Sequence, residues 1–521
     1  MDTKIAKTTK ESLIADIEKR QEDGIIEKSN AELLIKLIKN AEDLNEAINI
    51  AALGTTYKRT GFHFDKRLEK LGSDIKYFKK NEKLSFVEAN GTTIGERTAN
   101  PITHKLIIGD NYDALQNLLI EYKGKIDVIY IDPPYGKDSM GEFAETNYDN
   151  AITRDNLLSM LYNRLVLARE LLADDGVIFC SIDDKNQAYV KCLFDEVFGE
   201  RNYINNFMWL HGKGKKNKQS RTMQQYNISF AKNIDRTPEW NEKQYTDYKF
   251  TNPDNDPKGE WFSGSISFDE KRSNPKHENY YTIKSPSGVI WTRQWQVSED
   301  EMDDLIKSGD IFFGYPPEYD NTPRLKIRPS QIDIIPSNII DNVGTTKSAE
   351  TSLYSVLGTN CFNYPKPVGL IKHFLSIINN KSAKVLDFFA GSGTTGQAVM
   401  ELNKQDGGNR QFILCTNNEK TDTTPNGIAY DVTSKRLKRV MTGKCYDGTS
   451  DFEWIKKNDP LGGSLDVYEI ESVSNHESAP SKTAFDVIDE TLYGMPKFSN
   501  ANEKIKWVCE NFEHAQKCES R

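Results

Sequence analysis

Residues 130–138, YIDPPYGKD, place an acid, two prolines and a tyrosine directly after a short apolar run. Asp-Pro is a common signal for the end of a strand, so a turn is the simplest interpretation. The same residues, Asp132, Pro133, Pro134 and Tyr135, could instead form a catalytic site. A carboxylate oxygen, a backbone carbonyl and an aromatic ring would then hold fixed mutual positions, because proline fixes φ at about −65° and has no N–H.

A second motif, VLDFFAGSGTTGQAV at residues 385–399, has a buried strand, a glycine turn and a helix in succession. Gly391 and Gly393 would let the backbone approach a ligand closely, and the helix that starts near Thr394 would present free N–H groups. The next apolar segment ends in Glu419, where an acid can accept hydrogen bonds from ribose hydroxyls. The pattern predicts a nucleotide-type cofactor, although a tight turn with a surface glutamate is the structural alternative.

Two classes of cofactor fit this glycine turn, a nicotinamide or flavin dinucleotide and S-adenosylmethionine. Asp387 favours S-adenosylmethionine, because a carboxylate beside the glycines suits a ligand with an ammonium group and repels a pyrophosphate. The sequence has no G-x4-G-K-[ST] motif, so we do not expect P-loop ATP hydrolysis.

Apolar strands alternate with helical segments from about residue 104 and again after residue 355, which predicts an α/β fold with a parallel sheet covered on both faces. One of these helices is predicted to end at Gly176. Residues 8–55 have helical periodicity. Residues 235–355 lose the alternation and are rich in Asn, Asp, Pro, Trp and Tyr, which indicates a separate, partly β insertion.

The composition indicates a globular protein, with 37% hydrophobic and 28% charged residues. Neither an apolar run of about 18 residues nor the apolar core of a signal peptide is found, so we expect no membrane segment. Seven cysteines are scattered without a C-x2-C pair, and the seven histidines are isolated. This pattern predicts reduced thiols in a cytoplasmic protein and no metal site.

The net charge of −9 does not argue against a nucleic-acid partner, because DNA affinity depends on local basic patches. Residues 211–221, HGKGKKNKQSR, contain no acid and are predicted either to contact DNA or to form a solvated surface. Their basic residues are Lys213, Lys215, Lys216, Lys218 and Arg221. A second basic cluster comprises Lys435, Arg436, Lys438 and Arg439.

Taken together, Asp-Pro-Pro-Tyr at 132–135 and Phe-Ala-Gly-Ser-Gly at 389–393 resemble the motifs of β-class N6-adenine DNA methyltransferases. In that class the catalytic motif precedes a target-recognition region, and the cofactor motif comes last. Further segments resemble the modification subunits of type III restriction-modification systems: LIIGDNYDAL, NRLVLARELLADDGVIFCSIDD, QYNISFAKN and YPKPVGLIKHFLSI. The resemblance covers roughly residues 100–235 and 355–440.

The resemblance implies a Rossmann-like S-adenosylmethionine-dependent methyltransferase sheet with helices on both faces, an inserted irregular α+β recognition domain and a helical N-terminal extension. The expected domains are an N-terminal helical extension (1–100), the catalytic half of the methyltransferase domain (101–235), the target recognition domain (236–355), the cofactor-binding half (356–445) and a C-terminal extension (446–521).

The resemblance also implies roles for single residues. The methionine part of the cofactor would be lined by Asp387, Phe389, Gly391 and Gly393, with Thr394 at the start of the helix. Glu419 would hold the ribose, Asp110 would lie near the adenine or merely cap the helix that begins at Asn111, and Lys366 and Pro367 would pack near the methionine end. Tyr226 lies where the family places an aromatic residue against the flipped base, but the usual preceding histidine is Gln225 here.

The chemistry expected is methyl transfer to the N6 amine of adenine in double-stranded DNA after base flipping. Asp132 and the Pro133 carbonyl would accept the two amine hydrogens, and Tyr135 would stack on the base. Two alternatives stay open: cytosine-N4 methylation, for which Ser usually replaces Asp132, and an inactive DNA-recognition subunit. The resemblance further implies a homodimer, a separate helicase-nuclease restriction subunit and a place on DNA in a prokaryotic cytoplasm.

Overall fold

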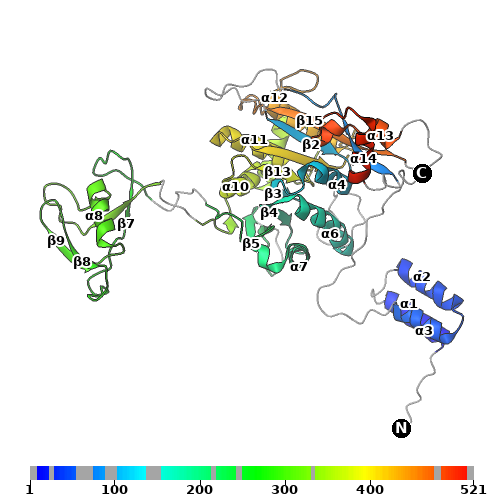
Figure 1. Cartoon of the computed structure of the whole chain (residues 1–521), viewed down its shortest axis with the longest axis horizontal. Helices are drawn as coiled ribbons and strands as arrows, with labels where there is room; N and C mark the ends of the chain where they lie inside the picture. Colours follow the sequence, from blue (N-terminus) through cyan, green and yellow to red (C-terminus); the bar gives the residue numbers. More distant parts are fainter. Residues whose placement is uncertain are drawn as a thin grey trace, which may run out of the picture. The chain divides into compact units, whose positions relative to one another are not determined.

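The computed structural model describes residues 9–22, 28–53, 74–87, 102–135, 154–212, 219–241, 249–329, 335–474 and 483–512. The chain consists of two compact units, Met1–Lys66 and Arg67–Arg521 (Figure 1). In the described part of the chain, every helix is too short or too polar to cross a membrane.

The first unit is a small bundle of three helices, α1 (Lys10–Glu22), α2 (Lys28–Asn40) and α3 (Leu44–Leu53). Its core is formed by apolar residues at helical spacing, among them Ile17, Ala31, Ile38 and Ala47. The predicted helical extension ran to residue 100, but residues 75–80 form a strand of the second unit.

A ten-stranded sheet organises the second unit, in the order β1-β15-β2-β14-β13-β3-β4-β6-β5-β12. The strands are β1 (Ile75–Lys80), β2 (Thr103–Ile108), β3 (Ile126–Ile131), β4 (Leu172–Ile182), β5 (Tyr203–Leu210), β6 (Gln224–Ala231), β12 (Ile339–Ile340), β13 (Lys384–Asp387), β14 (Gln411–Thr416) and β15 (Ser464–Val473). From β15 to β4 all neighbours are parallel, whereas β6 is antiparallel to both β4 and β5.

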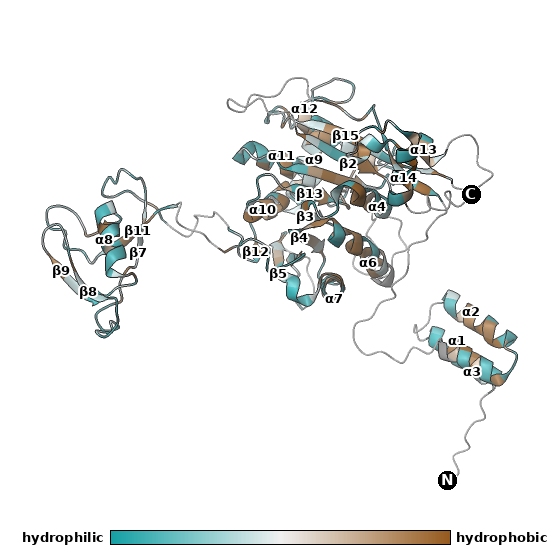
Figure 2. Cartoon of the chain, viewed as in Figure 1, coloured by the Kyte–Doolittle hydropathy of each residue, from teal (hydrophilic) through white to brown (hydrophobic). Residues whose placement is uncertain are grey.

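Helices cover the sheet on both faces, and the predicted α/β fold class is confirmed. The helices are α4 (Asn111–Tyr122), α6 (Arg154–Leu171), α7 (Gln187–Phe198), α9 (Thr346–Leu357), α10 (Val368–Ile378), α11 (Thr394–Asp406), α12 (Ser434–Thr442), α13 (Ala484–Val487) and α14 (Ala501–Asn511), with short turns at Glu200–Asn202, Ala429–Thr433 and Glu490–Tyr493. Val128 and Val177 share a core with α9 to α12, and the alternating Ile129 and Ile178 are equally buried, so neither face is open. Figure 2 shows apolar residues concentrated in the strands and in α10.

One helix boundary was predicted wrongly. The helix expected to end at Gly176 ends at Leu171, and β4 begins at Leu172. Leu172 pairs with Ile126 of β3, so pairing within the sheet takes the segment that local periodicity assigned to a helix.

Residues 249–329, the insert, fold around a core of their own. A three-stranded sheet (β10 Ile311–Phe312, β11 Arg324–Ile327, β7 Phe262–Gly264) and a hairpin (β8 Tyr280–Lys284, β9 Ile290–Gln294) accompany α8 (Glu299–Ser308). Trp291, Trp295, Met302 and Phe313 form much of the core. The insert is therefore a small α+β fold. Residues 314–320, GYPPEYD, contain two prolines and a tyrosine as the catalytic motif does, but no acid precedes the prolines, and the segment forms a loop.

Candidate active site

Four acids that the sequence singled out lie at or just beyond the ends of four adjacent parallel strands. The strands are β2, β14, β13 and β3, in that spatial order, and the acids are Asp110, Glu419, Asp387 and Asp132. Leu386 pairs with Ile129, so β13 and β3 end at the same edge of the sheet. Ligands of open α/β sheets bind outside this carboxyl edge. Local sequence could not predict this strand order.

The side chains of Asp132 and Tyr135 are joined by a lysine from a distant segment. Tyr135 Oη donates to Asp132 Oδ1 at 2.9 Å. Lys366 Nζ donates to the same Oδ1 at 2.7 Å and to Tyr135 Oη at 2.8 Å. Burial, followed by the charge of Asp132, raises the pKa of Tyr135 well above its ordinary value, so the phenol keeps its proton.

The turn that contains Tyr135 is fixed from the β4–α7 connection. The buried Asn186 donates from Nδ2 to the Tyr135 carbonyl oxygen at 2.8 Å and to Asp183 Oδ1 at 2.9 Å. Neither Asn186 nor Asp183 was predicted from the sequence. The acids of SIDD, which come directly after a buried strand, could have indicated these residues. Side chains at the carboxyl end of a strand lie where ligands bind in such a sheet.

The glycine turn after β13 surrounds a buried carboxylate. Asp387 Oδ1 accepts from Phe389 N at 3.0 Å, and Thr395 Oγ1 donates to Asp387 Oδ2. Gly391 and Gly393 have φ of +47° and +77°, which explains why glycine occupies both positions. Burial raises the pKa of Asp387 to about 7, and the negative charge of Asp132 adds to the rise. Among the described residues the hydrogen-bond partners of Asp387 are this backbone N–H and this hydroxyl, and neither is a cation.

Thr394 bonds inward, to the interior beneath the turn. Arg436 Nη1 donates to Thr394 Oγ1 at 2.9 Å and to the Ser392 carbonyl at 3.2 Å, while Arg436 Nε donates to Gln397 Oε1 at 2.9 Å. Burial lowers the pKa of Arg436 to about 10, still far above neutrality. The buried guanidinium therefore ties the turn and α11 to α12.

A cavity of about 130 Å³ connects the two motifs at the strand ends. Its lining residues are Asp110, Asn111, Pro134, Met160, Arg164, Phe388, Phe389, Thr416 and Asn417. The cavity thus reaches from the turn at Pro134 to the ends of β2 and β14. Its dimensions and position suit part of a small ligand.

Asp110 caps α4 and is also held by an arginine. Its carboxylate accepts from Tyr112 N at 2.8 Å and from Arg164 Nη2 at 3.1 Å. Arg164 also donates to Asn111 Oδ1, and Asn111 Nδ2 donates to the Phe388 carbonyl at 2.8 Å. Arg164 and Asn111 were missed in the sequence, since an arginine in an amphipathic helix is usually exposed.

Two further residues predicted to bind cofactor, Glu419 and Pro367, are described by their local contacts. The Glu419 carbonyl accepts from Ile428 N at 2.9 Å, and its half-buried side chain follows β14. Pro367 precedes α10 with an extended backbone, and the preceding Lys366 pairs with Asp132 at 2.7 Å.

The predicted DNA-contact residues are only partly described. Lys213, Lys215, Lys216 and Lys218 lie outside the described residues, whereas Arg221 is exposed. Tyr226 lies on β6 and accepts a hydrogen bond from Gln224 Nε2 at 3.2 Å.

The second basic cluster is not a free patch. Arg436 is buried, Lys435 pairs with Asp431 at 2.8 Å, and Arg439 Nη1 donates to the Val356 carbonyl at 2.7 Å. Lys438 Nζ lies 4.1 Å from the centroid of the Phe86 ring. Each of these four basic residues therefore has a partner within the fold, which the sequence of the cluster alone does not reveal.

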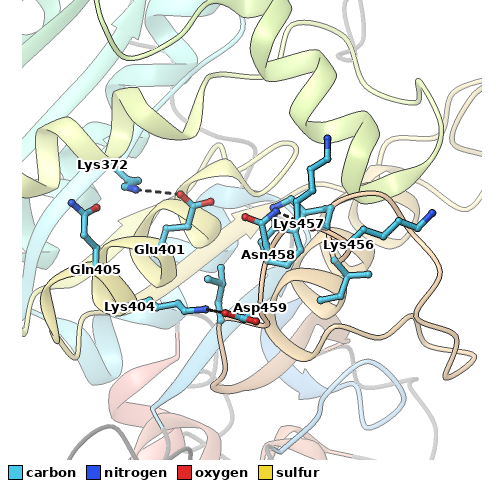
Figure 3. A pocket seen from close by; sticks show the side chains of 11 residues that line it. Lys372, Glu401, Lys404, Gln405, Lys456, Lys457, Asn458 and Asp459 are labelled. Carbon is cyan, nitrogen blue, oxygen red and sulfur yellow. Dashed lines mark hydrogen bonds and ion pairs between the residues drawn. The ribbon is translucent and has the colours of Figure 1, made fainter.

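A second hollow, of about 630 Å³, contains none of the motif residues (Figure 3). Two of its lysines pair with acids of the same hollow: Lys372 with Glu401 and Lys404 with Asp459, each at 3.3 Å. Mixed charges on an open surface give it no chemistry comparable to that at the strand ends.

A family model described as DNA methylase matches residues 126–423, more than half of the chain. The chain belongs to the DNA methylase family. The match includes both motifs of this DNA methylase, from β3 to the segment beyond Glu419, and it confirms the resemblance seen in the sequence. Residues 10–128 match a second family, of uncharacterised conserved proteins.

Curated relatives of this DNA methylase include restriction-modification proteins. The StyLTI Mod subunit, of a type III restriction-modification enzyme from Salmonella typhimurium, is 33% identical over 61% of this chain and 53% of the relative. The EcoPI Mod subunit of Escherichia phage P1, also type III, is 32% identical over 68% and 64%. The type II methyltransferase M.KpnI of Klebsiella pneumoniae is 27% identical over 67% and 89%. The chain spans about half to two thirds of the type III relatives.

Solved structures include the PvuII cytosine-N4-specific DNA methyltransferase, with a TM-score of 0.33 and 13% identity over 60% of this chain and 82% of that chain. The M1.HpyAVI–SAM complex has a TM-score of 0.30 and 14% identity, over 64% and 98% of the two chains.

Proposed function

We propose that this DNA methylase transfers a methyl group from S-adenosylmethionine to the N6 amine of adenine in double-stranded DNA. The observation that carries the proposal is the meeting of Asp132 and Asp387 at the ends of the adjacent strands β3 and β13. The negative charge of Asp132 contributes to the raised pKa of Asp387, so the two carboxylates interact electrostatically. An amine acceptor and a cation-binding acid thus share one edge.

The catalytic role of the first motif follows from the electronic structure of the amine. An exocyclic amine is a poor nucleophile because its lone pair is delocalised into the ring. Asp132 and the Pro133 carbonyl would accept its two hydrogens and so make the lone pair available. Tyr135 would stack on the base that has left the duplex, a contact worth about 1–3 kcal/mol. The Asn186 hydrogen bond to the Tyr135 carbonyl supports this arrangement by holding the turn.

The surroundings of Asp387 fit a positively charged ligand. The carboxylate is buried, and among the described residues its partners are a backbone N–H and a hydroxyl, with no cation. S-adenosylmethionine carries an ammonium and a sulfonium, and when bound it supplies the methyl group. Asp387, Phe389, Gly391, Gly393, Thr394 and Glu419 would form the methionine and ribose side of its site, and Asp110 would lie at the adenine side, beside the cavity.

We further propose that the protein is the modification subunit of a type III restriction-modification system. The type III relatives support this assignment. In that role it would form a homodimer, act with a helicase-nuclease subunit and work on DNA in the cytoplasm of a prokaryote. The insert would read the target sequence, and Arg221, Tyr226 and the lysines from 213 to 218 would contact DNA.

Long-read sequencing tests the proposal directly. The chain is expressed in cells that lack other DNA methyltransferases, with an Asp132→Ala strain as the control. N6-methyladenine at one recurring sequence, absent from the control, is the expected result. N4-methylcytosine would move the assignment to the cytosine-N4 class, and unmodified DNA in both strains would contradict methyl transfer.

A further inference from the structure

Lys366 forms a closed triangle with the two polar side chains of the catalytic motif. Its Nζ is 2.7 Å from Asp132 Oδ1 and 2.8 Å from Tyr135 Oη, and those two atoms are 2.9 Å apart. The ammonium also lies 5.1 Å from the centroid of the Tyr135 ring. The resemblance to known methyltransferases suggested a place near the methionine end of the cofactor. The contacts in the structure are to Asp132 and Tyr135, the two residues proposed to bind the target base.

The three side chains of the triangle are largely shielded from solvent, so the attraction between Lys366 and Asp132 is strong. The Lys366 side chain is 9% exposed and that of Asp132 is 27% exposed. A charged pair of this kind is weakly screened compared with a surface pair. The charge of Lys366 reaches further, because after burial it is the next cause of the lowered pKa of His211.

The pattern of donors determines which oxygen of Asp132 is available. Tyr135 keeps its proton, so it donates to Oδ1 and accepts from Lys366. Oδ1 thereby accepts two hydrogen bonds, one of them charge-assisted. Among the described residues, the hydrogen bonds of Asp132 all involve Oδ1, so these bonds leave Oδ2 open to a substrate amine.

We propose that Lys366 is a positioning residue for the target amine, acting through Asp132 and Tyr135 and not through the cofactor. It fixes the rotation of the carboxylate so that Oδ2 meets an amine hydrogen, and it tethers the hydroxyl of the ring on which the base stacks. This inference rests on the proposed methyl transfer to DNA.

The test compares Lys366→Met with Lys366→Arg and with Lys372→Met. The methionine removes the charge at similar length, and the arginine keeps a cationic donor. Lys372 is the matched control, because it lies on α10 just beyond Lys366 and pairs with Glu401 in the second hollow. Two quantities are measured on the full chain: the Kd of S-adenosylmethionine by calorimetry, and the single-turnover rate of methyl transfer to a mixture of unmethylated DNA fragments at saturating cofactor.

For Lys366→Met we expect a rate about 100-fold lower, the loss typical of a reacting group misplaced by ~1 Å. Its Kd for S-adenosylmethionine should stay within about threefold of the wild-type Kd, which is a small change in binding free energy. Lys366→Arg should recover part of the rate, and Lys372→Met should leave both quantities unchanged. Circular dichroism checks that each variant is folded.

Two results would overturn the inference. A weakened Kd with an unchanged saturating rate in Lys366→Met would assign the lysine to the cofactor. Wild-type values of both quantities would show that the triangle has no role in the reaction. An inactive wild-type chain is a different result, because it contradicts the proposed methyl transfer itself and with it this role for Lys366.

Discussion

Asp132 and Asp387 are both acids at strand ends, yet their surroundings suit different tasks. Asp132 is half-buried and bonded to an ammonium and a phenol, so one face of a charged carboxylate is fixed. Asp387 is fully enclosed, and among the described residues it has only neutral partners. The first environment suits an acceptor for a neutral amine, and the second suits a counter-charge for a cation.

Asp132→Ala should lower methyl transfer by at least about 100-fold, the range seen when one preorganised polar group is lost from an active site. The substitution removes the amine acceptor but none of the contacts of Asp387, so binding of S-adenosylmethionine should be largely kept. Transfer of a tritiated methyl group and calorimetric binding check the two halves. Retained methyl transfer in Asp132→Ala would contradict the catalytic role of Asp132.

The raised pKa of Asp387 predicts that the free energy of unfolding of the cofactor-free protein depends on pH. Its folded pKa is about 7 and its ordinary value is 3.8, so the folded chain holds a proton that the unfolded chain releases between these values. The stability from this group is complete below pH 3.8 and is lost as pH rises through about 7. Asp387→Asn should therefore be more stable than wild type at pH 8, by a margin that shrinks toward pH 5.

Urea unfolding at a series of pH values measures this difference. The asparagine can keep both hydrogen bonds, to Phe389 N and to Thr395 Oγ1, so it isolates the charge. It should also weaken S-adenosylmethionine binding at pH 8. An equal pH dependence in the two proteins would mean that Asp387 is not the titrating group.

At the scale of elements, α11 offers a matched pair of glycines. Gly393 at its start and Gly407 at its end have φ of +77° and +69°. A Cβ at Gly393 would lie 3.2 Å from Thr433 Cγ2, whereas one at Gly407 meets nothing within 4 Å. An L-residue at either position would strain the backbone, but only one at Gly393 would also crowd the turn.

Gly407→Ala should cost about 1–2 kcal/mol of stability, the price of left-handed backbone for an L-residue, and leave cofactor binding intact. Gly393→Ala should cost more and also weaken S-adenosylmethionine binding, because Thr433 donates to the Gly391 carbonyl at 2.6 Å and any shift moves the turn. Thermal unfolding and calorimetry on the two variants separate the effects. Equal binding by both would contradict a role for the turn in holding cofactor.

Local sequence predicted the two motifs, the alternation of strands and helices and the insertion, because each depends on neighbouring residues. It did not predict the strand order that brings Asp110, Glu419, Asp387 and Asp132 to one edge. Lys366 could not be assigned to Asp132, since the two are far apart in the chain and meet only through the packing of α10. Arg436 was misjudged for a related reason: a basic letter does not tell whether tertiary structure buries it.

At the scale of the whole molecule, the first unit, taken by itself, has exposed apolar side chains. Leu33 and Leu37 on α2 are 56% and 44% exposed, and Leu44 and Ile48 on α3 are 39% and 38% exposed. Residues four apart lie on one face of a helix, so the exposed side chains form pairs. Such a stripe is a candidate contact for the proposed homodimer.

If the stripe forms the dimer contact, the chain should have twice its monomer mass by size exclusion with light scattering. Leu33→Glu combined with Leu37→Glu should give the monomer mass at micromolar concentration. Asn30→Glu with Asn40→Glu adds the same charge at exposed polar positions of α2 and should leave the dimer intact. A monomeric wild type would contradict the proposed assembly.

The insert leaves the sheet after β6 and the chain returns at β12, two strands away in the spatial order. It has its own core, whereas the acids of the active site follow strands on the other side of β4. In evolution, the insert could therefore be replaced by another segment with its own core, without a change in the residues at the strand ends that form the active site. If the insert reads the target sequence, as proposed, the recognised DNA sequence would evolve independently of the catalytic residues.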